Sequence, residues 1–201
     1  MENNSQDALE NLFVRSTLPA QQVPELDLYM DQIITLIQQG LSENCRSEDE
    51  KILTKTMINN YSKDKLLKPI KGKKYSKEHI LMLLLIYHLK QNLSITDIKR
   101  FLDTMATELS GEEEGRYHSA EVRQTYDAFS AMQLQQKERL PQYVRECLSR
   151  MPEAGSQEEE TRRLFLTLTC IAEAASSAAQ ELLDQTAARA KPEKPAVSGK
   201  K

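Results

Sequence analysis

Hydrophobic positions recur at helical spacing along most of the chain. From Pro24, apolar residues recur at helical spacing and predict a first helix that ends near Gly40; they are Leu28, Tyr29, Ile33, Leu36 and Ile37. The segment 42–50, SENCRSEDE, is polar throughout and predicts a connector. The chain therefore begins its ordered part as a helix followed by a long polar loop.

A second helix is predicted around Leu53, Met57 and Tyr61, which fall on one face together with Ile58. Thr54 is a suitable N-cap because its hydroxyl can accept a hydrogen bond from the first turn. The opposite face of this helix is polar and carries Lys55, Thr56, Asn59, Asn60 and Lys63. We expect Tyr61 to be mainly a core residue.

Two further helices are predicted after a basic loop. Ser76 precedes the apolar run ILMLLLIY, which is too short to span a membrane and predicts a buried helix to about Gln91. The sequence S-I-T-D from Ser94 is a capping box that opens a helix to about Thr107. The region from 24 to 107 is therefore expected to form one compact helical unit.

The C-terminal part is predicted to hold long helices. One runs from about Ser119 to Lys137, and a shorter one begins at Pro141, a residue that suits a first helical position. A capping box at Ser156 opens a helix to about Ala190. Its apolar seam has heptad-like spacing and consists of Leu164, Leu168, Ile171, Ala175, Ala178 and Leu182. The seam fits a dimer contact and an intramolecular bundle equally well.

These patterns divide the chain into five segments. We expect a flexible N-terminus (1–22), a helical domain (23–108), an acidic linker (109–118), a C-terminal helical region (119–190) that packs as a bundle or a dimer, and a disordered basic tail (191–201).

Composition agrees with a helix-rich protein. Tryptophan is absent, aromatic residues make up 5%, and there are only 6 glycines, so a sandwich or barrel is disfavoured and almost no strand is expected. The N-terminal residues lack the basic and apolar regions of a secretory signal, which predicts a cytoplasmic protein without membrane contact.

Charge is distributed unevenly, although the formal net charge is only −3. Residues 51–100 contain twelve Lys and Arg against three Asp and Glu, which gives +9 and leaves −12 on the rest of the chain. A basic patch on an otherwise acidic protein is typical of a polyanion-binding face, although a solvated lysine-rich surface would have the same composition.

Catalytic and metal-binding patterns are not found in the sequence. It contains no phosphate-binding glycine loop, nucleophile elbow or zinc-protease helix motif, and Cys45, Cys147 and Cys170 lie far apart. His79 and His88 flank the apolar run and are expected to pack at the edge of the core. We therefore expect a non-enzyme with no catalytic residues, no metal site, no cofactor and reduced thiols.

The segments INNYSKDKLLKP and GKKYSKEHI resemble the winged helix-turn-helix of MerR-type transcription regulators, and LSITDIKRFL resembles the last helix of that domain. Residues 26–102 also resemble a family of bacterial proteins known only as a domain of unknown function and regarded as MerR-like regulators. Asn59 stands where MerR proteins have a recognition-helix arginine, and Lys65 where they have a glycine.

The resemblance implies an all-α fold of winged helix-turn-helix type with a minimal β wing, joined to a C-terminal helical region. It also implies a transcription regulator that binds double-stranded DNA as a homodimer. The residues expected to contact DNA are Lys55, Thr56, Asn59, Asn60 and Lys63 on the recognition helix and Lys71, Lys73 and Lys74 on the wing.

Two other functions fit the basic patch. The same scaffold could be a non-catalytic interaction module whose lysines dock an acidic protein. RNA binding is less favoured, because single-stranded RNA is read with exposed aromatic side chains and the nearby Tyr61 and Tyr75 are better explained by packing.

Overall fold

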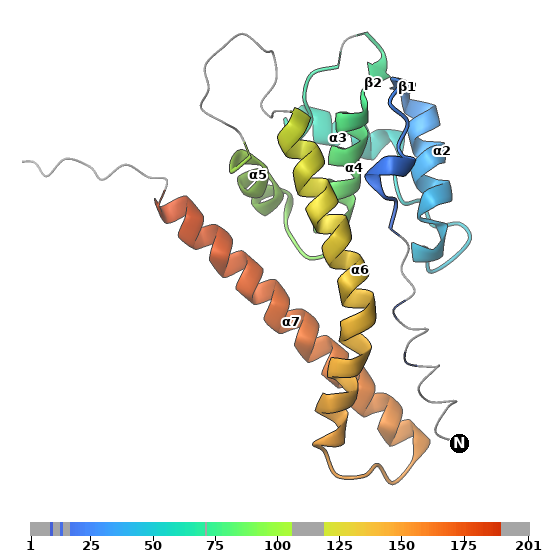
Figure 1. Ribbon diagram of the computed structural model, residues 1–201, viewed down its shortest axis with the longest axis vertical. Helices are drawn as coiled ribbons and strands as arrows, with labels where there is room; N and C mark the ends of the chain where they lie inside the picture. Colours follow the sequence, from blue (N-terminus) through green and yellow to red (C-terminus); the bar gives the residue numbers. More distant parts are fainter. Residues whose placement is uncertain (1–8, 10–12, 14–16, 71, 106–118, 190–201) are drawn as a thin grey trace, which may run out of the picture.

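The computed structural model describes residues 9, 13, 17–70, 72–105 and 119–189 (Figure 1). The predicted acidic linker, the predicted basic tail, Lys71 and most of the predicted flexible N-terminus lie outside these residues. Helices dominate the described part, which confirms the all-α class, and its one sheet has two short strands.

The first half of the chain forms a helical body. It contains the 3₁₀ turns η1 (Ala20–Gln22) and η2 (Ser42–Asn44) and the strands β1 (Leu28–Tyr29) and β2 (Lys74–Tyr75). Its helices are α2 (Met30–Gly40), α3 (Lys55–Lys63), α4 (Lys77–Leu89) and α5 (Ile95–Asp103).

The start of the first predicted helix is wrong, because α2 begins at Met30 and not near Pro24. Leu28 and Tyr29 form β1, which pairs antiparallel with Tyr75 and Lys74 of β2. Leu28 and Tyr75 are both buried, so this pairing with a distant segment, and not the local periodicity, sets the backbone conformation here.

The core is built around α4. All seven residues from Ile80 to Ile86 are buried, as expected for an apolar run that other elements surround on every side. The buried cluster extends from Leu18 in the N-terminal segment to Tyr126 in α6. Gly40, the last residue of α2, permits the close approach of Leu18, since a Cβ there would lie 2.8 Å from its Cδ1.

The helix α6 (Ser119–Ser149) is continuous, so the predicted break before Pro141 is wrong. An interior proline removes one backbone hydrogen bond and typically costs about 3 kcal/mol. Val144, in the turn after Pro141, is fully buried, and packing on that side of the proline favours continuation of the helix.

The helix α7 (Gln157–Arg189) begins at the predicted cap, where the Glu159 amide donates to Ser156 Oγ at 3.2 Å. The predicted apolar seam of α7 is buried along only part of its length. Leu164, Leu168 and Ile171 are half-buried in a helix that packs on α6, whereas Ala178 and Leu182 are exposed. Intramolecular packing therefore accounts for the first part of the seam only.

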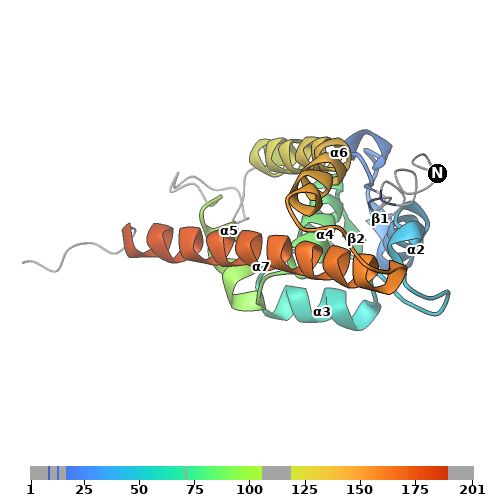
Figure 2. The ribbon, with the colours of Figure 1, turned by 90° about the horizontal axis from the view of Figure 1, so that it is seen from below.

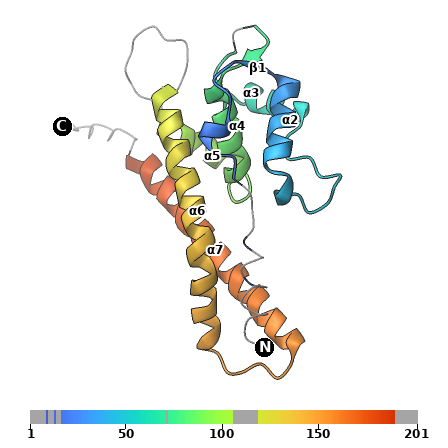
Figure 3. The same cartoon turned by 45° about the vertical axis from the view of Figure 1, so that its right-hand side comes forward.

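Together α6 and α7 form a long antiparallel hairpin whose connected ends project beyond the body (Figures 1 and 3). The other end of α7 lies against α5, where Arg100 and Asp184 form an ion pair of 2.8 Å. In Figure 2, α3 and α6 lie on opposite sides of the molecule. The face of α3 that points away from the core is therefore free of the hairpin helix α6.

Three negative findings apply to the part of the chain that the structure describes. No helix there is both long and apolar enough to cross a membrane. No group of three or more His, Cys, Asp or Glu side chains there is placed to hold a metal ion. Cys45, Cys147 and Cys170 form no disulfide.

Candidate nucleic-acid interface

Helix α3 is fixed at its N-terminus by the predicted cap. Thr54 has extended backbone angles, and its Oγ1 accepts a hydrogen bond of 3.2 Å from the Met57 amide. This bond satisfies one of the amides that a helix start leaves without a partner. The residue just before α3 therefore fixes where the helix begins and, with it, which side chains lie on its polar face.

The C-terminus of α3 closes in a Schellman motif centred on Lys65. The Leu66 amide donates to the Tyr61 carbonyl at 2.9 Å, and the Lys65 amide donates to the Ser62 carbonyl at 3.1 Å. Lys65 has a φ of 58°, in the left-handed region that favours glycine. Lys65 thus adopts a backbone conformation that glycine adopts more easily.

The two faces of α3 differ as the sequence predicts. Ile58 and Tyr61 are buried, at 0% and 5% exposure, and Met57 is half-buried. Burial raises the pKa of the Tyr61 phenol, which keeps it neutral. The expectation that Tyr61 is a core residue is confirmed. The exposed face of the helix holds Lys55, Thr56, Asn59, Asn60 and Lys63.

The predicted wing lies in the segment between α3 and α4. Lys73 and Lys74 are exposed, while Tyr75 is buried at 3%. In the pairing of β2 with β1, Lys74 lies opposite Tyr29, and its Nζ is 5.2 Å from the centroid of the Tyr29 ring. This geometry is a cation–π contact at an exposed site.

The start of α2 brings the two groups of lysines together. Lys55 Nζ, from the first turn of α3, forms an ion pair of 2.7 Å with Asp31, two residues after Tyr29. Both side chains of this pair are mostly exposed, so it contributes less than about 1 kcal/mol and is easily exchanged for another anion. Lys55 and Lys74 thus border the same end of α2.

Seven of the eight residues predicted to contact DNA are therefore exposed, and the eighth, Lys71, lies outside the described residues. Tyr29 and Asp31 border this surface but are absent from the predicted set. The periodicity places them inside a helix and gives no signal for their contacts with Lys74 and Lys55, which depend on tertiary structure.

A search against family models identifies residues 18–129 as a domain of unknown function, DUF1836. The chain belongs to the DUF1836 family. The DUF1836 match extends past α5 and includes the start of α6, so it contains the whole candidate interface. No curated protein and no solved structure matches the chain.

Membership of DUF1836 confirms the resemblance of residues 26–102 to a family of unknown function. Kinship with MerR-type regulators is not indicated by this match and stays a prediction. The helix α7 lies outside the matched residues.

Proposed function

We propose that this DUF1836 protein is a non-catalytic regulator that binds double-stranded DNA through α3 and the basic segment before α4. The observation that carries the proposal is the exposed face of α3, on which two lysines, two asparagines and a threonine lie opposite a buried apolar face. An exposed helix of this composition has the chemistry needed to enter a major groove.

The expected roles differ between the two groups of residues. Asparagine can donate to and accept from adenine at once, so Asn59 and Asn60 would read bases. Lysines act mainly as point charges, so Lys55, Lys63 and Lys73 would hold phosphates. The Lys55–Asp31 pair would open on binding, because a phosphate would take the place of an exposed carboxylate.

A winged helix-turn-helix arrangement fits this proposal. The helices α2 and α3 would form the helix-turn-helix, with the longer connector 41–54 between them. The loop that leads into β2 would be the wing, and it is anchored to the body by the pairing of β2 with β1. A regulator of this kind would act in the cytoplasm of a bacterium, beside the chromosome.

The hairpin of α6 and α7 would supply a homodimer contact. Large apolar side chains that project from it include Leu134, Tyr143, Phe165 and Leu166, each at least half exposed. Pairing of two hairpins would bury these residues in a bundle and would place two copies of α3 on one DNA duplex.

The proposal is tested by fluorescence-anisotropy titration of labelled random-sequence duplex DNA across a salt series. We expect affinity to fall steeply with the logarithm of salt concentration, since bound lysines release counterions. Replacing Lys63, Lys73 and Lys74 by alanine should weaken binding and flatten the salt slope by about one for each phosphate that a lysine no longer neutralises.

A matched variant removes the same charge from a different surface. Arg139, Arg150 and Arg162 are exposed on the hairpin, and their replacement by alanine should leave DNA affinity unchanged. On a sequence selected from a random pool, Asn59→Ala should cost about 1–3 kcal/mol, whereas Lys73→Ala should weaken all sequences equally.

Absence of DNA binding at low salt would overturn the proposal and would favour the interaction module. The exposed Lys55–Asp31 pair shows how a carboxylate can dock on the surface, and an acidic protein would then be the expected partner. Equal losses for the two triple-alanine variants would likewise reject α3 and its neighbouring loop as the DNA surface.

A further inference from the structure

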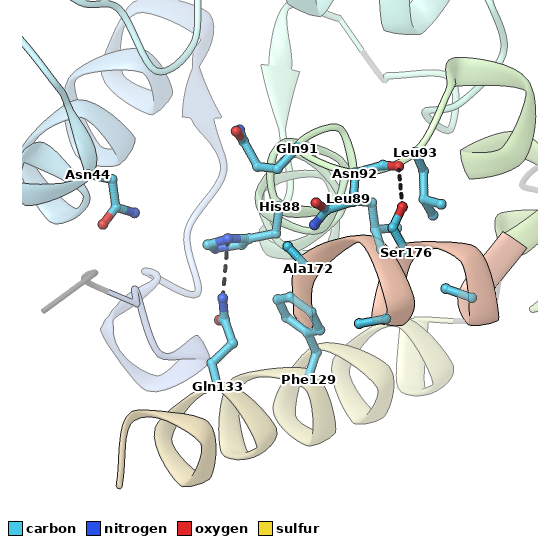
Figure 4. A pocket seen from close by; sticks show the side chains of 12 residues that line it. Asn44, His88, Leu89, Gln91, Asn92, Leu93, Phe129, Gln133, Ala172 and Ser176 are labelled. Atoms are coloured by element: carbon cyan, nitrogen blue, oxygen red, sulfur yellow. Dashed lines mark hydrogen bonds between the residues drawn. The ribbon is translucent and has the colours of Figure 1, made fainter. Parts of the chain in front are cut away.

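A pocket of about 380 Å³ lies where the C-terminal end of α4 meets α6 and α7 (Figure 4). His88 and Leu89 come from α4, Phe129 and Gln133 from α6, and alanines from α7. The pocket is therefore lined by both the matched DUF1836 region and the helix beyond it. Its volume is in the range of small-molecule sites in proteins.

The small side chains of α7 keep this pocket open. Ala172, Ala175 and Ala179 fall on one face of the helix and line the wall, where larger residues would fill the space. The position of this wall is held by Ser176, whose Oγ donates to the Asn92 carbonyl at 3.4 Å. The same helix is held further along by the ion pair of Asp184 with Arg100.

Aromatic rings form another part of the wall. The rings of His88 and Phe129 lie with centroids 5.3 Å apart at an angle of 49°. Flat molecules pack well against such tilted rings, through stacked or edge-to-face contacts. The two rings thus favour an aromatic body in the ligand.

One polar group in the pocket has an unused bonding position. The Gln133 carboxamide contacts His88 Nδ1 at 3.3 Å through one end, and its Oε1 is buried without a hydrogen-bond partner among the described residues. A buried carbonyl oxygen without a partner is unfavourable unless a bound molecule supplies a donor. Gln133 therefore indicates where a polar group of a ligand would lie.

The charge of the lining restricts the ligand further. None of the residues that line the pocket is an Asp, Glu, Lys or Arg. A second pocket of about 400 Å³ adjoins it at Asn44 and Gln91 and is basic on balance, with Arg46, Lys51 and Lys90 beside a single acid, Glu50. An anionic ligand would find no cationic side chain of Lys or Arg in the first pocket and would be drawn to that neighbour.

We infer that the pocket between α4, α6 and α7 binds an uncharged aromatic molecule whose hydrogen-bond donor meets the Gln133 carboxamide. Such a ligand would hold α7 against the end of α4 and thereby stabilise the packing of the hairpin on the body. The inference is independent of the proposed DNA binding, because none of the residues that line the pocket belongs to α3 and the test uses no DNA.

Two fluorescent probes with the same aromatic body make a sharp test on the full chain. N-phenylnaphthylamine is neutral and has one N–H donor, whereas anilinonaphthalene sulfonate adds an anionic group. We expect the neutral dye to bind at one site per chain and more tightly than the sulfonate. Absence of saturable binding by the neutral dye would overturn the inference.

Variants locate the bound dye. Ala175→Phe would fill the pocket and weaken binding of the neutral dye at least about ten-fold, whereas Ala174→Phe, an exposed position on α7 outside the lining, would leave it unchanged. Gln133→Leu, which keeps the side-chain size, should weaken it about five-fold through loss of one hydrogen bond.

Each contrary result has a definite meaning. Unchanged dye binding by both Ala175→Phe and Gln133→Leu would place the dye on the exposed apolar residues of the hairpin and overturn the pocket. Tighter binding of the sulfonate, abolished in Ala175→Phe, would overturn the uncharged class of ligand. If Ala175→Phe does not fold, the affinity of Gln133→Leu for the neutral dye decides, and an unchanged affinity would overturn the inference.

Discussion

Tyr126 of α6 donates a hydrogen bond from its hydroxyl group to the carbonyl oxygen of Leu18, at a distance of 2.7 Å. Both residues are buried, at 1% and 3% exposure, although 108 positions separate them in the chain. The bond joins the two ends of the matched DUF1836 region, residues 18–129. This hydrogen bond helps to explain why the start of α6, far along the chain, packs with the helical body.

Removal of this hydroxyl should destabilise the body. Tyr126→Phe leaves the Leu18 carbonyl buried without its donor, so we expect the free energy of unfolding to fall by about 1–3 kcal/mol in urea denaturation. Ser177→Ala is the control, because it removes a hydroxyl group from an exposed position on α7 and its change should stay within about 0.5 kcal/mol. Equal effects would show that the buried bond adds nothing.

The left-handed conformation at Lys65 makes glycine the better residue there. Non-glycine residues pay roughly 1–2 kcal/mol to adopt it, so Lys65→Gly should raise the free energy of unfolding by about 0.5–1 kcal/mol after the entropy of glycine is counted. Lys63→Gly, at the last residue of α3 where the backbone is helical, should instead lower it, because glycine is a poor helix former. Chemical denaturation of both variants checks the opposite signs.

The N-terminal turn of α4 should respond to pH through His79. Its Nδ1 accepts a hydrogen bond of 3.2 Å from the Ser76 amide, and burial lowers the pKa of its ring. The unfolded chain therefore binds the proton more readily. Stability should be constant above about pH 6.5 and should fall as pH drops from there towards the folded pKa.

The variant His79→Gln isolates this titration. Glutamine can accept the same Ser76 hydrogen bond in a capping box but cannot gain a proton near neutral pH. Urea midpoints measured between pH 5 and 8 should therefore slope in the parent protein and become flatter in the variant. Identical slopes in both proteins would assign the pH dependence to other groups.

Acid should weaken the contact of α6 with α4 in a separate pH range. Arg123 donates from Nε to Glu78 at 2.8 Å and from Nη2 to Glu25 at 3.1 Å, while Lys77 contacts Glu25 at 2.6 Å. Hydrogen bonds from Lys77 and Arg123 lower the pKa of Glu25. Burial opposes ionisation of Glu78, but hydrogen bonds from Ser76 and Arg123 outweigh it and lower the pKa of that carboxyl.

Carboxyl groups with lowered pKa values stabilise the fold above their ordinary pKa of 4.5, and this contribution is lost as pH falls through the folded values. Arg123→Met should therefore reduce stability at pH 7 and flatten its decline below about pH 4.5. Arg150→Met removes an exposed pair with Glu146 and should keep the parent's profile. Thermal melts from pH 3 to 7 would distinguish them.

Local signals explain which parts of the fold are predictable. Thr54, Ser94 and Ser156 each accept a hydrogen bond from an amide three residues later, as their capping sequences predict. The strand at Leu28 and the continuity of α6 through Pro141 are not predicted, because both depend on packing between segments distant in the chain.

The same distinction applies to the two candidate sites. Helical periodicity is sufficient to predict which face of α3 is exposed, because its apolar and polar residues alternate with the helical repeat. The pocket at Gln133 draws side chains from three helices, and no spacing in the sequence brings His88, Phe129 and Ala175 together. Local pattern places His88 only at the edge of the core.

The proposed homodimer can be tested at the projecting hairpin of α6 and α7. Phe165 and Leu166 are 66% and 63% exposed near the start of α7, where α6 covers little of either side chain. Exposed apolar residues of this size are unusual on a monomer when they cluster, and burial of each against a second copy would contribute about 1.5–3 kcal/mol. Replacing both with serine should therefore convert a dimer into a monomer in analytical ultracentrifugation.

The control is the pair Thr169→Ser and Cys170→Ser, which lies one turn further along α7, is exposed and removes little apolar surface. This control should remain a dimer and bind DNA as the parent does. The Phe165 and Leu166 variant should keep its helical circular dichroism, because neither side chain is part of the buried core. A parent protein that sediments as a monomer at high concentration would contradict the dimer while leaving the DNA surface on α3 open to its own test.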